Sequence, residues 1–595
     1  MEFLATTSIE SFWDIRKRIV FLSEACRLHK RRPFWSRLES EQLPFLWDSV
    51  EKTSEADAHC TALTAKAIGP MTDFLNRYHG LEKESGYYEI VLRTWLDHLI
   101  HQVYDRTHAL ERAFERYPNL TTWRLDPADY YYPLEHSDAV HLACWDDRYN
   151  LQLYSQIMTE MELDFPTRRL EDPGPLSHPE HLVWPPHRQR RVTRYFFKLS
   201  RWLSSMRGQR AVMVSPYFKY QVCWNYIWFL IKSGFRVQFD EFDQQVSIPL
   251  GLDLETRRQR LDLGPGKLAS ILGGILISQI PRLFLEGFAD FRREVLKLDL
   301  PKAPLYITRN AAHYNHIFKL YFAEQFGKPD QSRLMILQHG GGEGYDWTNL
   351  PEAYERQLAD RFGTFGWREG EKTEPVPFPY PARSSLFKWV AHQPPSRRLV
   401  TITDAPRYLY RFQFQPCGDM FLLEAVNGLI RFFDAVEDRS PFLVRNWSYL
   451  DTEWGVRERL LERAPDLVFD DLSRDFIQQL EQGDMHISHH IGTTFLESMA
   501  LDVPTLAFLS PRVYRFRPAA ELEVGKLRQV GIVHDTPEGA AAHYNAICTD
   551  PHVWWSKREV QVARLTFIEQ YAWTCKDWYR CWLREIQKQL ALAGS

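Results

Sequence analysis

A histidine and four glycines follow an apolar run in the stretch LMILQHGGGEGYDW, at positions 334–347. The run predicts a buried strand, so the histidine and the glycines lie where that strand ends. Glycine tolerates positive φ and lets backbone N–H groups approach a ligand closely, and successive N–H groups form a concavity that binds anions. We therefore expect this loop to contact a charged substrate, through Gln338, Gly340, Gly341 and Gly342.

Two side chains of the same loop have the chemistry of catalysis. His339 could donate to a phosphate or to a developing oxyanion, and Glu343 could act as a base. The HGGG run also occurs in esterases as half of an oxyanion hole, but that interpretation needs a G-x-S-x-G nucleophile elbow, which the sequence lacks. A tight turn beside a core histidine is the alternative without function, and three consecutive glycines make it less attractive.

A second predicted strand end lies in the stretch HHIGTTFLESMALDVPTL. The strand ends near His490, and Gly492 allows a sharp turn into a helix that begins at Thr493 or Thr494. The free N–H groups at the start of this helix favour a phosphate. Glu497 lies on the same helical face, where its carboxylate could accept both hydroxyls of a ribose. The alternative is a capping box between Thr494 and Glu497 that only holds the helix.

Other residues at strand ends are less specific. Arg445 ends the predicted strand PFLVRNW, which suggests a clamp for phosphate or carboxylate, with a surface ion pair as the alternative. Histidines also cluster in the pattern H-x-x-H-H, at positions 486, 489 and 490. A strand scatters these rings to both faces, and no carboxylate or cysteine completes a ligand set, so we expect no metal site.

The composition bounds the class of protein. With 595 residues the chain is too long for one core, and a net charge of −4 gives no argument for nucleic-acid binding. Eight cysteines without a CxxC pair and an N-terminus without a signal pattern indicate a reduced, cytoplasmic protein. The most apolar window, at 268–285, is too short for a spanning helix and predicts a buried one, with an interfacial membrane contact as the minor alternative.

Strands alternate with helices in two series, which predicts an α/β fold with two Rossmann-like domains facing a cleft. The predicted parts are an N-terminal mixed and helical region joined to the first domain, the two domains, and a helical C-terminal tail. Their limits are 1–165, 195–350, 385–535 and 536–595. Proline-rich segments at 165–191 and 368–385 predict a linker or surface loop and an interdomain boundary.

The spacing of Gly492, Glu497 and Pro504 resembles the donor-nucleotide site of glycosyltransferases with two Rossmann-like domains, the GT-B fold. The chain as a whole resembles a family of bacterial transferases encoded in surface-polysaccharide and O-antigen loci. The resemblance includes the stretches LQHGGGEGY, DRFGTFGW and GTTFLESMALDVPT. That family is similar, more distantly, to bacterial transferases of Kdo and related ulosonic sugars, which use CMP-activated donors.

The resemblance implies a glycosyltransferase that moves a sugar, of the ulosonic type from a CMP donor, onto a bacterial surface glycan such as lipopolysaccharide. The implied partners are a nucleotide sugar as substrate and a glycan or lipid-linked acceptor, with no separate cofactor and no nucleic acid. Peripheral contact with the inner face of the membrane is also implied, and the basic run RRVTR at 190–194 could touch anionic lipid.

For the site, the resemblance places Thr493, Thr494 and Glu497 at the nucleotide and His339 beside the donor. It does not fix the catalytic acid or base, for which Glu343 and Asp404, at another predicted strand end, are the candidates. Three alternatives stay open, because the fold alone does not select a reaction. They are a CDP-alcohol-type phosphotransferase, a sugar-nucleotide epimerase and a non-catalytic glycan-assembly protein.

Overall fold

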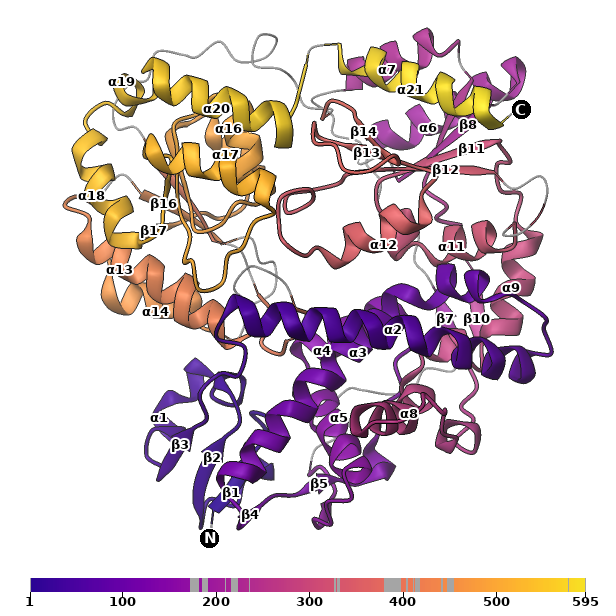
Figure 1. Cartoon of the computed structure of the whole chain (residues 1–595), viewed down its shortest axis with the longest axis vertical. Helices are drawn as coiled ribbons and strands as arrows, with labels where there is room; N and C mark the ends of the chain where they lie inside the picture. Colours follow the sequence, from indigo (N-terminus) through magenta and orange to yellow (C-terminus); the bar gives the residue numbers. More distant parts are fainter. Residues whose placement is uncertain are drawn as a thin grey trace.

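The computed structural model shows two α/β domains side by side, with the N-terminal region beneath them both (Figure 1). It describes residues 2–171, 181–183, 191–208, 210–215, 223–234, 236–244, 246–325, 328, 332–378, 397–402, 405–409, 411–412, 418–439, 442–446, 454–575 and 577–593. Of the two segments predicted as loops, 165–191 lies largely outside these residues, whereas 368–378 of the second lies within them and contains a short strand at Thr373–Pro375.

The second domain is built on a parallel six-stranded sheet with the order β17-β16-β15-β18-β19-β20. Its strands are β15 (Arg397–Ile402), β16 (Phe442–Asn446), β17 (Val468–Phe469), β18 (Gly483–Ser488), β19 (Thr505–Phe508) and β20 (Val533–His534). The helices are η9 (Phe421–Val426), α13 (Asn427–Ala435), α14 (Val456–Arg463), α15 (Phe476–Leu480), α16 (Thr493–Ala500) and α17 (Pro518–Gln529). The strand order reverses between β15 and β18, so ligands are expected in the crevice beyond their carboxyl ends.

The first domain has a second parallel sheet, in the order β14-β13-β12-β11-β8-β9. Its strands are β8 (Ala211–Val214), β9 (Val237–Asp240), β11 (Leu305–Thr308), β12 (Arg333–Leu337), β13 (Arg361–Thr364) and β14 (Thr373–Pro375). The helices are α6 (Arg191–Arg207), α7 (Cys223–Lys232), α9 (Phe288–Lys297), α10 (Ala311–Tyr314), α11 (His316–Ala323) and α12 (Leu350–Leu358). Helix α8 (Lys267–Gln279), between α7 and α9 in the chain, packs instead on helices of the N-terminal region. A small antiparallel pair joins β7 (His181–Val183) to β10 (Ser247–Pro249).

Two features of the first domain differ from the expectation. The sheet continues past the predicted limit of 350, because β13 and β14 are short strands with polar residues that give no periodic signal. His339 therefore follows an interior strand of the sheet, β12, rather than the last strand of the domain. The apolar window at 268–285 forms the buried helix α8, as predicted.

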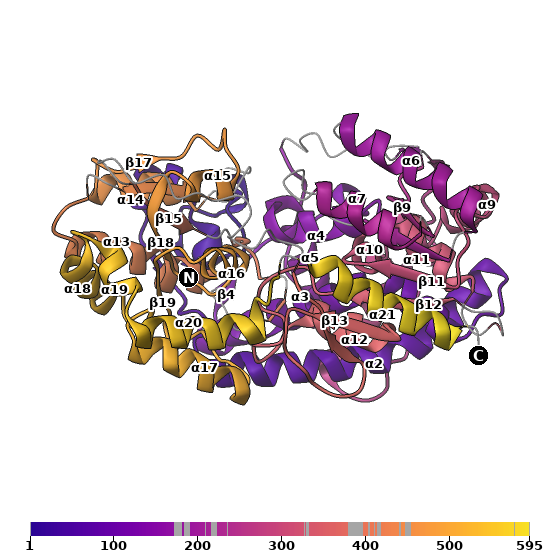
Figure 2. The same cartoon turned by 90° about the horizontal axis from the view of Figure 1, so that it is seen from above.

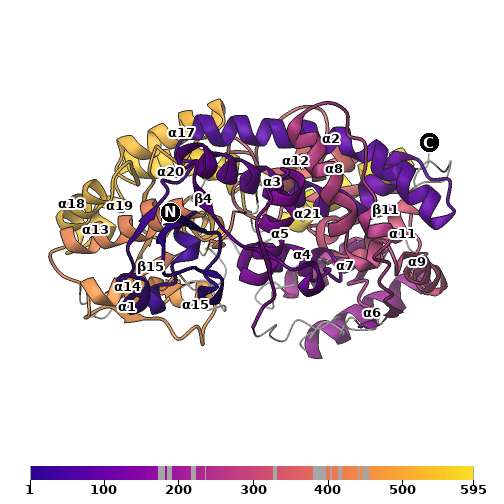
Figure 3. The ribbon, with the colours of Figure 1, turned by 90° about the horizontal axis from the view of Figure 1, so that it is seen from below.

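The N-terminal region has its own parallel sheet, in the order β3-β2-β1-β4, which the helical periodicity of the sequence did not reveal. Its strands are β1 (Glu2–Ala5), β2 (Arg18–Phe21), β3 (Ser40–Gln42) and β4 (Leu120–Thr121). The helices are α1 (Arg32–Trp35), α2 (Val50–His79), α3 (Ser85–Arg116), α4 (His136–Trp145) and α5 (Asp147–Glu160). Figure 3 shows α2 running beneath both domains.

Helix α3 ties the N-terminal region to both domains. Lys319 Nζ on α11 of the first domain donates to Thr94 Oγ1 at 2.9 Å. Arg106, which is fully buried, donates to the carbonyl of Leu409, in the segment that follows β15 of the second domain. The N-terminal region therefore holds both Rossmann-like domains rather than extending only the first.

The C-terminal tail is shared between the two domains (Figure 2). Its helices are α18 (Pro537–Ile547), α19 (Pro551–Trp555), α20 (Arg558–Tyr571) and α21 (Trp578–Ala593). Helix α20 packs on α16 and α17 of the second domain, whereas α21 crosses to the first. There Trp578 lies 5.2 Å from Tyr226 and 6.3 Å from Phe229 of α7, measured between ring centroids.

The two sheets with helices on both faces confirm the predicted α/β fold with two Rossmann-like domains. Both sheets direct the carboxyl ends of their strands toward the segments that carry the predicted site. Within the described ranges, none of the helices combines the length and the apolar character that crossing a membrane requires.

Candidate functional site

The two loops singled out in the sequence touch each other across the boundary between the domains. The backbone N–H of Gly341, in the loop after β12, donates to Thr493 Oγ1 at 3.0 Å. Thr493 is the first residue of α16 and lies 152 positions further along the chain. The predicted catalytic loop and the predicted nucleotide loop therefore meet at the junction of the two domains.

The glycines are required by this contact and by the shape of the loop. A Cβ on Gly341 would lie 2.6 Å from the carbonyl carbon of Gly492 and 2.7 Å from the backbone nitrogen of Thr493. Gly342 and Gly344 adopt φ values of +93° and +82°, which L side chains rarely adopt. Glycine at these positions thus serves the close approach of the two domains and a tight turn.

This finding corrects the expected role of the loop as a free anion-binding concavity. The N–H groups of Gly341 and Gly344 donate to Thr493 and to Glu352 of α12. The N–H of His339 points at Glu343 Oε1, at 3.4 Å. These three backbone N–H groups therefore donate to other groups of the protein, one of which is the carboxyl group of Glu343 in the same loop.

Gln338 also has an internal role rather than the predicted contact with a donor. The residue is fully buried, and its Oε1 accepts from the backbone N–H of Phe365 at 2.8 Å and from Trp367 Nε1 at 2.9 Å. Its Nε2 donates to the carbonyl of Gly340 at 2.9 Å. The side chain therefore fixes the loop to the strand end of β13, because each of its polar atoms has a protein partner.

His339 lies against two carboxyl groups. Its Nδ1 is 3.0 Å from Glu343 Oε1 and 3.9 Å from Glu355 Oε2, on α12. Both glutamates are buried, whereas the histidine side chain is 28% exposed. Nδ1 itself is buried and forms no hydrogen bond in this geometry, although Glu343 Oε1 lies 3.0 Å from it. Part of the ring is exposed, so a substrate can reach the imidazole while Glu343 lies beside Nδ1.

Burial dominates the electrostatics of this group. Burial raises the pKa of Glu343 well above its usual range, the nearby Glu352 raises it further, and backbone hydrogen bonds from His339 and Gly340 oppose the shift. Burial also raises the pKa of Glu355, with Glu343 and Glu352 adding to the effect. Burial, together with the nearby cations of Arg309 and Arg411, lowers the pKa of His339 to about 4. The cluster therefore favours a neutral imidazole beside carboxyl groups that retain protons.

The same three residues could hold a metal ion. His339, Glu343 and Glu355 each offer one ligand atom, and these atoms all lie within 4.8 Å of one another. One imidazole nitrogen and two carboxylates form a donor set that suits a divalent transition metal. The sequence analysis did not anticipate this group, because Glu355 is a single glutamate on a helix with no distinguishing pattern.

The predicted nucleotide side of the site lies at the start of α16. Gly492 precedes the helix in an extended conformation, with φ −118° and ψ −168°. A Cβ there would lie 2.3 Å from His490 Nε2, so Gly492 makes room for that imidazole. Thr493 and Thr494 form the first turn, and Glu497 is buried one turn further along. The N-cap of this helix is Gly492, so Thr494 is the second helical residue and not the cap that the alternative of a Thr494–Glu497 capping box requires.

The remaining predictions have different outcomes. Arg445 is buried in an ion pair with Asp470 and donates to the carbonyl of Arg474 at 3.0 Å, so it stabilises its own domain rather than clamping a ligand. Asp404 lies outside the described residues. His486 is a core residue, with ring nitrogens 2.8 Å from Thr401 Oγ1 and from Ser498 Oγ.

Two cavities border the second domain. One, of about 250 Å³, opens beyond the carboxyl ends of β18, β19 and β20 and is lined by polar residues that include His489, Ser510, Arg512 and Thr536. Tyr514 in its wall donates to the carbonyl of His489 at 3.0 Å, two residues before Ile491 and the turn into α16. This cavity could accept part of a ligand held at α16.

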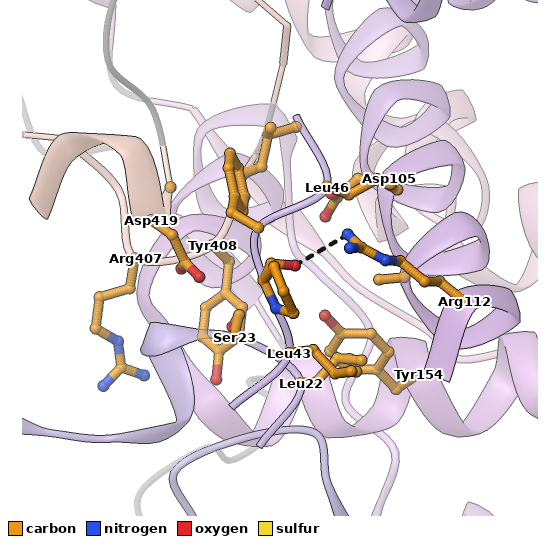
Figure 4. A pocket seen from close by; sticks show the side chains of 15 residues that line it. Leu22, Ser23, Leu43, Leu46, Asp105, Arg112, Tyr154, Arg407, Tyr408 and Asp419 are labelled. Carbon is orange, nitrogen blue, oxygen red and sulfur yellow. Dashed lines mark hydrogen bonds between the residues drawn. The ribbon is translucent and has the colours of Figure 1, made fainter. Parts of the chain in front are cut away.

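The other cavity lies away from the site, between the N-terminal region and the second domain (Figure 4). Its volume is about 40 Å³, which is room for water and not for a substrate. Arg112 in its wall donates to the carbonyl of Pro44 at 3.0 Å. Asp419 of the second domain also lines the cavity. It is a gap in a structural junction.

Comparison with solved structures finds weak similarity only. A mutant of the O-GlcNAc transferase from Thermobaculum terrenum is 12% identical, over 90% of this chain and 99% of that one, with a TM-score of 0.35. The UDP-GlcNAc 2-epimerase from Neisseria meningitidis is 9% identical over 64% and 99%, with a TM-score of 0.34. MurG from Acinetobacter baumannii is 11% identical over 66% and 95%, with a TM-score of 0.33. At these values the similarity does not bear on activity.

Comparison with known sequences is more informative. No curated protein matches the chain. The profile of one protein family, described as LIC12162 family transferase, matches residues 2–586, which is almost the whole length. This match agrees with the expectation of a transferase from the sequence. The chain belongs to the LIC12162 family of transferases.

Proposed function

We propose that this protein is a nucleotide-sugar-dependent glycosyltransferase whose reaction takes place at the junction of the two Rossmann-like domains. The observation that carries the proposal is the hydrogen bond from Gly341 to Thr493, because it joins the His339 loop to the start of α16. A histidine with a partly exposed side chain and a helix start that can receive a phosphate are the two parts that glycosyl transfer needs side by side.

In this proposal α16 holds the donor. The N–H groups of its first turn have no partner within the helix, and they favour the phosphate that links the nucleotide to the sugar. The hydroxyl groups of Thr493 and Thr494 add polar contacts, and the carboxylate of Glu497 accepts hydrogen bonds from the ribose hydroxyls. The same phosphate stabilisation helps the nucleotide to leave with the electron pair of the broken bond.

His339 then takes the proton of the acceptor. An acceptor hydroxyl attacks the anomeric carbon of the donor sugar, a carbon–oxygen bond forms, and the bond from that carbon to the nucleotide phosphate breaks. The hydroxyl proton passes to Nε2 of His339. Glu343 acts as a positioning residue, because its carboxyl group contacts Nδ1 and stabilises the imidazolium that forms.

His339 and Glu343 can act together as a base in only one protonation state. Nε2 accepts a proton only when the imidazole carries its hydrogen on Nδ1 and donates it to an ionised Glu343. The neutral pair, with a protonated Glu343, holds one proton more. Since burial raises the pKa of Glu343, activity should depend on the loss of this shared proton.

The proposal extends to the donor and the acceptor. We take the donor to be a CMP-linked sugar of the ulosonic type and the acceptor to be a glycan of the bacterial surface, on a lipid carrier at the inner face of the membrane. The support for these finer points is the sequence resemblance carried by LQHGGGEGY and GTTFLESMALDVPT.

The test is product analysis with the purified full-length chain, a panel of nucleotide sugars and membranes as the source of acceptor. A glycosyltransferase transfers labelled sugar to the lipid fraction and releases the nucleotide. Release of a phosphoalcohol product or of an epimerised nucleotide sugar would replace the proposal with one of those reactions. Transfer by wild type and not by His339→Gln or Glu497→Gln, with Glu521→Gln on exposed α17 as control, would tie the activity to this site.

A further inference from the structure

Helix α6 has two apolar faces on opposite parts of its surface. One face packs into the first domain, where Phe196 and Phe197 contact Phe239 of β9 at centroid distances of 5.2 and 6.1 Å. The other face is open to solvent and consists of Tyr195, Leu199, Trp202 and Met206. These four residues recur at intervals of four, three and four, so they form one stripe along the helix. Between 48% and 72% of each side chain is exposed.

Helix α7 extends this surface. Tyr226 and Phe229 of α7 contact the same Phe239 that α6 covers, so the two helices lie side by side on one face of the sheet (Figure 2). The outer side of α7 presents Trp228 and Ile231, which are 50% and 42% exposed. We call the exposed residues of both helices the α6–α7 face. Large apolar side chains exposed on two neighbouring helices mark a docking surface, whereas single scattered ones are normal on a protein surface.

The stretch of sequence that contains both helices carries charge of one sign. Positions 181–239 contain eleven lysines and arginines and no aspartate or glutamate, in a chain whose net charge is −4. Lys198 on α6, Lys232 at the end of α7 and Arg236 beyond it are exposed. Arg201 is paired with Asp240, the first acidic residue after this segment. The α6–α7 face thus combines apolar side chains, tryptophan among them, with a cationic border.

We infer that the α6–α7 face docks on the surface of an anionic lipid bilayer. Tryptophan and tyrosine favour the boundary between headgroups and acyl chains, and lysine and arginine are attracted to acidic headgroups. A helix that keeps one face on its own domain and offers a second apolar face to the outside can enter that boundary without unfolding. A second copy of the chain fits less well, because a symmetric contact would bring two cationic surfaces together.

The inference goes beyond the proposed reaction, since it concerns where the enzyme works and not what it transfers. It assigns the membrane contact to the first domain, the one that carries His339 and Glu343. A bilayer under this domain would supply a lipid-linked acceptor to the side of the site opposite the nucleotide.

The experiment is flotation of the full-length protein with two kinds of vesicle, phosphatidylcholine alone and phosphatidylcholine with one third phosphatidylglycerol. We expect at least tenfold more binding to the anionic vesicles, and loss of most of this binding in 0.5 M salt. The double variant Trp202→Ser/Trp228→Ser should bind at least tenfold less, as should Lys198→Glu/Lys232→Glu. Leu522→Ser, which changes an equally exposed apolar residue on α17, should bind like wild type.

Equal binding of the tryptophan variant and wild type, or no binding to anionic vesicles, would overturn the inference. Self-association that the same substitutions abolish, without vesicle binding, would assign the face to a second copy instead. Nucleotide binding by the variants, measured by titration, separates this result from the proposed function: a variant that binds nucleotide but not vesicles supports the docking surface alone. All these side chains are exposed, so the variants should melt within a degree or two of wild type.

Discussion

Arg517, where α17 of the second domain begins, holds both carboxylate oxygens of Glu352 on α12 of the first domain, at 3.0 and 2.9 Å. The same Glu352 accepts the N–H of Gly344, and the N–H of Arg517 donates to the carbonyl of Tyr345 at 2.8 Å. The glycine-rich loop is therefore held from both sides of the domain boundary. Its position, and with it that of His339, depends on how the two domains meet.

The close packing of this loop predicts a specific effect of Gly341→Ala. The added methyl group would lie within 2.7 Å of backbone atoms of Gly492 and Thr493, so the domains must separate slightly. We expect the variant to be destabilised by about 1–3 kcal/mol and to lose most of its turnover. Gly525→Ala is the matched control, because a Cβ on that α17 residue meets no atom within 4 Å. The measurements are the melting temperature and the turnover of both variants. Equal values for Gly341→Ala and Gly525→Ala would show that the contact of Gly341 with Gly492 and Thr493 is not tight.

Removal of the base should affect turnover and spare binding. We expect His339→Gln to lower the rate of transfer by a factor of about 10²–10⁴, with little change in nucleotide affinity. Glu343→Gln should fall in the same range, because glutamine cannot stabilise an imidazolium. Single-turnover rates and binding titrations separate the two effects. A variant with normal turnover would exclude His339 as the base.

The proton shared by His339 and Glu343 predicts the direction of the pH dependence. Burial raises the pKa of Glu343, so the pair retains its extra proton to a higher pH than an exposed glutamate would. The base-competent form appears as that proton is lost, so the rate should rise with increasing pH and then level off. In Glu343→Gln this rise should be altered or absent. A rate that falls as pH increases through this range would contradict the assignment.

A chelator distinguishes proton transfer from metal chemistry at the same cluster. If His339, Glu343 and Glu355 share protons, EDTA should leave the rate unchanged, and Glu355→Gln should reduce it by less than Glu343→Gln does. Loss of activity in EDTA and its recovery with Mn²⁺ or Zn²⁺ would instead assign the cluster as a metal site. Measuring the metal content of the purified protein tests independently whether this cluster binds a metal ion.

The junction with the N-terminal region predicts a dependence of stability on pH. Burial raises the pKa of Asp419 from its usual 3.8 to about 8, and its Oδ2 accepts from the backbone N–H of Glu24 at 2.9 Å. The folded state therefore binds more protons than the unfolded state between these pKa values, so this group's contribution to stability falls as pH rises through that window.

The variant Asp419→Asn isolates this contribution. An asparagine oxygen can still accept the hydrogen bond from Glu24, but the amide does not titrate. The melting temperature of wild type should drop more between pH 6 and pH 9 than that of the variant. Parallel curves for the two proteins would mean that Asp419 is already ionised in the folded state at pH 6.

Much of the fold was accessible from the sequence because alternating strands and helices leave a periodic signal. Strand β13 cannot be predicted in this way, because its four residues, RFGT, show no alternation of apolar and polar side chains. The N-terminal sheet cannot be predicted either, because the helical periodicity of α2 and α3 dominates that part of the sequence. At the candidate site, the sequence predicted His339, Glu343 and Thr493 from their positions after apolar runs that end in glycine-containing turns. It could not show that Gly341 and Thr493 touch, because a contact between residues 152 positions apart leaves no local trace. Glu355 and Arg517 were missed for the same reason.

The most direct test of the proposed function is equilibrium binding of CMP, CDP, UDP, GDP and ADP to wild type, Glu497→Gln and His339→Gln. We predict that one nucleotide, CMP by preference, binds wild type and His339→Gln alike, and that its affinity falls at least tenfold in Glu497→Gln. At a hundred times its dissociation constant this nucleotide should stabilise the folded state by roughly 2.7 kcal/mol. Binding that survives unchanged in Glu497→Gln, or no binding of any of the five to wild type, would contradict a nucleotide site at α16.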